Sequence, residues 1–81
     1  MIRDNVKDIR EAKGVSASRV AKKLGLTPQG YYYIEGGQVE LKAERLKVIA
    51  EFLREDVSVF FDRKLTESVL ERIEGEVKCA K

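Results

Sequence analysis

The sequence contains no histidine, no tryptophan, one cysteine and one proline. Without histidine there is no imidazole for acid–base catalysis and no zinc site of the usual Cys/His kind, and the single thiol of Cys79 excludes an internal disulfide. No apolar run approaches the length of a membrane span, and residues 1–5 lack the charged-then-apolar order of a signal peptide. We therefore expect a cytoplasmic chain, with its thiol in a reducing compartment, that is not an enzyme and uses no metal, cofactor or membrane.

What the chain does contain is typical of one small globular domain. Its 81 residues are 43% hydrophobic and 37% charged, a balance that favours neither disorder nor low complexity. A chain of this length has room for a single hydrophobic core.

The net charge of +2 is unevenly distributed. Residues 12–34 contain Lys13, Arg19, Lys22 and Lys23 and no acidic side chain. Such a stretch is either a solvated helix face or a surface that faces phosphates, because local charge sets the release of counterions. Charge alone leaves both interpretations open.

The spacing of apolar residues indicates helices throughout and no strands, so we expect an all-α fold. Ser16 and Thr27 are good N-cap residues, and Pro28 suits a first helical position. The expected helices run from Asp4 or Asn5 to Ala12, Ser16 to Leu24, Thr27 to Glu35, Ala43 to Arg54, a short turn from Asp56, and Leu65 to Lys81, with a loop over residues 36–42.

Residues 17–36 have the features of a helix-turn-helix motif. Two steeply crossing helices need a small residue where they touch, which Ala21 supplies, and a turn residue that tolerates positive φ, which Gly25 supplies. Apolar residues that seal both helices onto a core are Val20, Leu24, Leu26, Tyr31 and Ile34.

With this motif in place, residues 5–61 resemble the helix-turn-helix domain of lambdoid phage repressors and Cro proteins, the XRE-type regulators. The segments that carry the resemblance are Ile9–Ser16, Val20–Thr27, Tyr33–Gly37, Leu46–Ala50 and Val57–Phe61. The resemblance implies a five-helix lambda-repressor-like DNA-binding domain whose third helix enters the major groove, usually as a homodimer on a palindromic operator. Residues 62–81 would add a C-terminal helical tail, a candidate dimerisation segment.

Among the departures from the family pattern, two concern helix ends. Arg19 stands where the family usually has an acidic residue, so a capping box with Ser16 is missing. Arg54-Glu55 stands where the family tends to have a glycine turn, which leaves the end of that helix open.

The expected contacts with duplex DNA fall on two helices. At 100° per residue, the outward face and N-terminal end of the third helix present the candidate base-reading residues, which are Pro28, Gln29, Tyr32 and Tyr33. The N-terminus of the second helix attracts anions, and the candidate phosphate contacts are Ser16, Ala17, Ser18, Arg19, Lys22 and Lys23. The resemblance also implies a structural ion pair between Arg10 and Glu35.

Two apolar sets are candidates for dimerisation. The first is Val57, Phe60 and Phe61, and the second is a stripe on the tail that includes Leu70, Ile73 and Val77. The stripe could equally fold back onto its own domain.

The leading hypothesis is a sequence-specific DNA-binding transcriptional regulator of repressor type, with double-stranded DNA and a second copy as partners and no evident small-molecule effector. The alternative is an antitoxin or antirepressor that uses the same fold to bind a protein.

Overall fold

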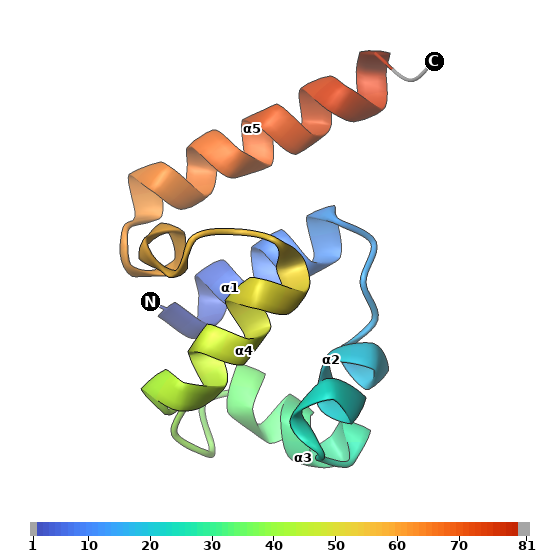
Figure 1. Ribbon diagram of the computed structural model, residues 1–81, viewed down its shortest axis with the longest axis vertical. Coiled ribbons are helices and arrows are strands. Elements are labelled where there is room, and N and C mark those ends of the chain that lie inside the picture. Colours follow the sequence, from blue (N-terminus) through green and yellow to red (C-terminus); the bar gives the residue numbers. More distant parts are fainter. Residues whose placement is uncertain (1, 80–81) are drawn as a thin grey trace.

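The computed structural model describes residues 2–79, with side chains to Gly75, and confirms an all-helical fold over that range. Its elements are α1 (Ile2–Ala12), α2 (Ala17–Leu24), α3 (Pro28–Glu35), α4 (Ala43–Leu53), the 3₁₀ turn η1 (Val57–Phe61) and α5 (Arg63–Cys79). The molecule measures 35 × 24 × 19 Å. Along its longest dimension, α2 and α3 lie at one end, α5 lies at the other, and α1 and α4 lie between them (Figure 1).

The predicted helix starts in the motif are confirmed. Ser16 Oγ accepts a hydrogen bond from Arg19 N at 3.2 Å, and Thr27 Oγ1 accepts one from Gly30 N at 3.1 Å. Each bond satisfies a backbone N–H that the first helical turn leaves free. Gly25 has φ 72°, so the left-handed turn between α2 and α3 uses the residue that adopts it without steric cost.

The predicted start of α1 is wrong. The helix begins at Ile2, and neither Asp4 nor Asn5 caps it. Asn5 is buried instead, and its Nδ2 donates a 2.9 Å hydrogen bond to the carbonyl oxygen of Phe60. The Asn5 side chain therefore bonds a distant carbonyl group and does not cap the helix, contrary to what the local sequence predicts.

One core joins all the elements. Its fully buried side chains include Ile9 of α1, Val20 and Ala21 of α2, Tyr31 and Ile34 of α3, Ile49 and Leu53 of α4, and Phe60 of η1. Helix α5 packs on α1 and η1 and adds Val69 and Ile73, each 8% exposed. Thr66 is also buried and donates to the carbonyl oxygen of Val59 at 2.6 Å.

This packing corrects part of the expected dimer surface. Phe60 is completely buried, so it is not available to a second copy, whereas Phe61 is 58% exposed. Ile73 is buried on its own domain, and Val57 and Leu70 are half-buried. The expectation for Val77 lies outside the described side chains. Leu70 and Ile73 of the stripe thus pack on their own domain. Dimerisation itself stays a prediction.

Candidate nucleic-acid interface

Helices α2 and α3 cross closely, at a point where α2 carries a small side chain. Ala21 has no exposed surface, and the Leu26 N–H donates to the Ala21 carbonyl oxygen at 2.8 Å across the turn. Tyr31 and Ile34 point into the core from α3. With this face buried, the opposite face of α3 is the one left to solvent.

All four predicted base-reading residues lie on that exposed face. Pro28 and Gln29 are exposed at the N-terminal end of α3, and Tyr32 and Tyr33 are 56% and 42% exposed. Gln29 Nε2 donates a 2.8 Å hydrogen bond to Tyr33 Oη, one helical turn away. The bond restrains the Gln29 side chain and leaves its amide oxygen and second N–H free, the acceptor and donor that an adenine edge requires.

A hollow of about 460 Å³ lies between the start of α2, α1 and the end of α3. Ser16 and Ala17 form its α2 side, Tyr32 and Gly36 its α3 side, and Lys7 contributes from α1. Ala17 is only 3% exposed, so it offers little surface of its own to an anion in this hollow. The free N–H groups and positive dipole end of α2 favour such an anion.

Lys7 was missed by the sequence analysis. It lies three residues before Arg10 on α1 and is exposed. That i, i+3 spacing puts it on the same helix face as Arg10 and is the signal that could have identified it.

The structure divides the basic residues of α2 between two faces. Arg19 and Lys23 line a separate hollow of about 420 Å³ with Phe52 and Arg54 of the α4 end. The Arg19 guanidinium carbon lies 5.8 Å from the centre of the Phe52 ring, within the range of a cation–π contact. Arg19 and Lys23 thus lie apart from the hollow that contains Tyr32, and their phosphate contacts stay predictions.

The ion pair between Arg10 and Glu35 is present in the structure. Arg10 Nε lies 2.7 Å from Glu35 Oε2 and Nη2 lies 3.0 Å from Oε1, with side-chain exposures of 8% and 5%. Arg10 Nη1 also donates to the Val15 carbonyl oxygen at 2.8 Å. This two-pronged contact fixes the C-terminal end of α3 to α1 and so sets the direction of α3.

The charged pair also affects two pKa values. Burial opposes the charged form of Arg10, but the Glu35 carboxylate outweighs it and raises the pKa of Arg10 above its ordinary value. Burial, together with that carboxylate, raises the pKa of Tyr31 far above its ordinary value. The Tyr31 hydroxyl is buried and has no hydrogen-bond partner among the described residues. The raised pKa keeps Tyr31 neutral beside the pair.

Within the residues described, no three or more histidine, cysteine, aspartate or glutamate side chains cluster as a metal site would require. No helix in the described part of the chain is both long and apolar enough to cross a membrane.

Comparison with known protein families gives a match over most of the chain. A family model described as helix-turn-helix matches residues 6–60, well over half of the sequence. No curated protein and no solved structure gives a significant match.

Proposed function

The chain belongs to the helix-turn-helix family of Cro/C1 type, a family of DNA-binding transcription regulators, and we propose that it is a repressor that occupies a palindromic operator as a homodimer. In this proposal α3 enters the major groove, and regulation acts through occupancy of the operator in the cytoplasm.

The exposed face of α3 is the observation that supports this proposal most. Gln29, Tyr32 and Tyr33 are exposed together on a helix whose other face is fully buried. Two large aromatic side chains beside an oriented amide are suited to base edges, thymine methyl groups and phosphates. In the proposal Gln29 reads a base, Pro28 packs against the groove, and the two tyrosines contact the backbone or a methyl group.

Phosphate contacts in this proposal come from the α2 N-terminus and the hollow beside it. The backbone N–H groups of Ala17 and Ser18 and the Ser16 hydroxyl face the anion, and Lys7 adds charge from α1. Lys22 follows Ser18 by one turn and shares its side of α2. Arg19 and Lys23 would serve a more distant phosphate on the α4 side.

The alternative, a protein-binding antitoxin or antirepressor, has one observation in its favour. Phe61 at the end of η1 and Leu65 at the start of α5 are 58% and 44% exposed and lie on either side of the junction between these two elements. An exposed apolar pair of this kind fits a protein partner. The start of α5 lies away from α3 (Figure 1), so the two activities are compatible in one chain.

Selection of bound sequences from a random duplex pool tests the proposal. We expect an enriched palindrome and a binding constant whose logarithm falls linearly as the logarithm of the salt concentration rises. Failure to enrich any sequence, with weak binding that does not depend on salt, would overturn the proposal and favour the protein-binding alternative.

Two lysine variants provide a matched control for the phosphate contacts. Lys22→Ala and Lys64→Ala each remove one exposed lysine, on α2 and on α5 respectively. Lys22→Ala should lower the salt slope by about one and weaken binding to all sequences alike. Lys64→Ala, at the other end of the molecule, should leave both unchanged, and equal effects would contradict the assigned face.

A further inference from the structure

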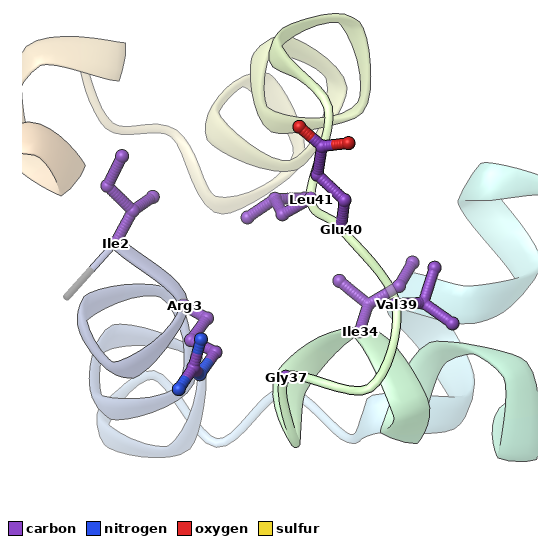
Figure 2. A pocket seen from close by; sticks show the side chains of 7 residues that line it. All are labelled: Ile2, Arg3, Ile34, Gly37, Val39, Glu40 and Leu41. Atoms are coloured by element: carbon purple, nitrogen blue, oxygen red, sulfur yellow. The ribbon is translucent and has the colours of Figure 1, made fainter.

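A surface hollow of about 400 Å³ lies beside the C-terminal end of α3, outside the proposed DNA-contacting face. Figure 2 shows its walls, which come from the first residues of α1 on one side and from the end of α3 and the following loop on the other. Its apolar side chains are Ile2, Ile34, Val39 and Leu41, and Val39 is 43% exposed. Ile34 is buried, Ile2 and Leu41 are half-buried and Val39 is exposed, so part of the apolar surface of this hollow meets water.

Two side chains of opposite charge line the same hollow. Arg3 lies against Gly37 so closely that a Cβ atom there would be 2.8 Å from Arg3 Cζ, which holds the guanidinium at the α1 wall. Glu40 lies on the loop and is exposed. Within residues 2–79, neither Arg3 nor Glu40 forms an ion pair. A surface with one positive and one negative wall around an apolar centre is complementary to a copy of itself turned by 180°.

The position of the hollow also suits a dimer on DNA. The start of α1 and the loop after α3 lie on the same side of the molecule, whereas α5 lies at the end opposite α3 (Figure 1). A two-fold axis at the α5 end would place the two copies of α3 at opposite ends of the assembly, where one DNA face cannot meet both. An axis at the hollow that runs along the longest dimension of the molecule instead keeps both copies of α3 at the same end of the assembly, where one DNA face can meet both.

We propose that this hollow is the homodimer interface, with Val39 of each copy entering the apolar centre of the other and Arg3 of each copy paired with Glu40 of the other. The inference rests on the proposed function for its two-fold geometry. The proposed interface is formed by α1, α3 and the loop after α3, and neither the tail nor η1 contributes to it.

Charge reversal tests the interface in a way that separates it from folding. In an Arg3→Glu chain, the introduced carboxylate would face Glu40 of the other copy at both contacts, and in a Glu40→Arg chain two arginine pairs would face each other. Sedimentation equilibrium of the free chain should show each variant alone dissociating at least about tenfold more readily than the unchanged chain. An equimolar mixture should recover dimerisation, because the heterodimer replaces one of the two contacts by a reversed pair of opposite charges and keeps the other as it was.

The control is Lys64→Glu, which makes the same kind of charge change at an exposed site on α5 and should leave sedimentation unchanged. Helical circular dichroism confirms that each variant folds, and the glutamate of Arg3→Glu falls in the first turn of α1, where an acid is favourable. A monomeric unchanged chain, single variants that behave like the control, or a mixture without recovery would each overturn the inference. A duplex with one selected half-site separates the two claims: if sedimentation follows the expected pattern but no duplex binds, the proposed function fails and the interface stands.

Discussion

Arg54 is the one non-glycine residue with positive φ in the described chain, at φ 59° and ψ 44°. It ends α4 in the left-handed conformation, and its N–H and that of Glu55 satisfy the Glu51 and Ala50 carbonyl oxygens at 3.1 and 3.0 Å. This geometry costs a residue with a Cβ atom roughly 1–2 kcal/mol. The sequence position is where the family tends to have glycine, and the chain keeps the turn in spite of the substitution.

Arg54→Gly should therefore stabilise the domain. Relief of the left-handed strain exceeds the added entropy of the unfolded chain, which costs about 0.4–1 kcal/mol, so we expect a gain of about 0.5–1 kcal/mol. Thermal unfolding should show a rise of a few degrees. Arg54→Ala removes the same side chain but keeps the strain, and an equal rise in that variant would show that strain is not the cause.

Gln29→Ala should relax base preference at one position per half-site by about 1–3 kcal/mol, because it removes the outward amide without touching the core. Sequence selection repeated with the variant measures the change. Tyr33→Phe keeps the ring but removes the hydroxyl that accepts from Gln29, so it should weaken preference at the same position by a smaller amount. Unchanged preference in a folded Gln29→Ala chain would remove Gln29 from the reading face.

Local sequence patterns do not predict the contacts of side chains whose partners lie far away in the sequence. Asn5 resembles a helix cap in the sequence, yet its side chain donates a hydrogen bond to the Phe60 carbonyl oxygen, 55 residues away. Arg19 belongs to a basic stretch in sequence, yet its neighbour Phe52 places it on the α4 side. Both outcomes depend on how elements pack, which no local pattern contains.

At the scale of the elements, the ends of α2 and α3 are predictable because local residues determine them. Ser16, Gly25 and Thr27-Pro28 carry the required caps and turn in consecutive sequence. The Arg10–Glu35 contact was expected only from family resemblance, since 25 residues separate the two side chains and no spacing rule joins α1 to α3.

That contact is a buried polar link between α1 and α3 and should be costly to break. Arg10→Met strands a buried carboxylate and leaves the Val15 carbonyl unbonded, so we expect a loss of about 3–5 kcal/mol in urea unfolding. Adding Glu35→Gln removes the stranded charge and should recover part of the loss. Losses that simply add in the double variant would argue against a coupled pair.

A second polar link holds α5 to the rest of the domain. The Glu55 side chain is 6% exposed and lies 2.8 Å from Lys13 Nζ and 2.5 Å from Arg72 Nη2. Burial raises the pKa of Glu55, but the hydrogen bonds and charges of Lys13 and Arg72 outweigh it, so the net pKa is below its ordinary value. This carboxylate therefore contributes stability that is fully present above its ordinary pKa of 4.5 and is lost as pH falls through the lower folded value.

We accordingly expect the free energy of unfolding to fall as pH drops below about 4.5, and to fall less steeply in Glu55→Gln. Urea titrations at a series of pH values measure both slopes. The pKa of Asp56 is also lowered, by hydrogen bonds from Ser58. Asp56 is present in both chains, so its contribution to the pH dependence is the same in each. Identical slopes in the two chains would show that Glu55 does not contribute.

At the scale of the whole molecule, α5 is part of the domain that binds DNA in our proposal. It lies at the end away from α3 (Figure 1), yet it covers η1 and α1 with Thr66, Val69 and Ile73. The apolar stripe in the sequence is compatible with either a dimer seam or a covered face, and only the packing distinguishes them. The DNA-contacting end is thus supported from the opposite end, through α1 and the Arg10–Glu35 pair.

Removal of residues 63–81 should therefore destabilise the whole domain. It exposes the apolar surface that Val69 and Ile73 cover, at about 1.5–3 kcal/mol for each side chain, and it leaves the Val59 carbonyl without Thr66. Against a typical stability of about 5–15 kcal/mol, the loss is large, and we expect the melting temperature to fall by at least about 15 °C.

Two single substitutions on α5 identify the cause of that fall. Ile73→Ala removes a side chain that is 8% exposed and should cost about 2–5 kcal/mol, whereas Leu65→Ala removes one that is 44% exposed and should cost far less. A truncated chain that melts within a few degrees of the full one would show that α5 is not needed for the core. Equal costs at the two positions would instead show that burial against α1 and η1 is not the cause, because Ile73 is 8% and Leu65 44% exposed and alanine is the better helix former at both. A large cost at Ile73 alone, together with loss of DNA binding on truncation, would place α5 among the structural supports of α3.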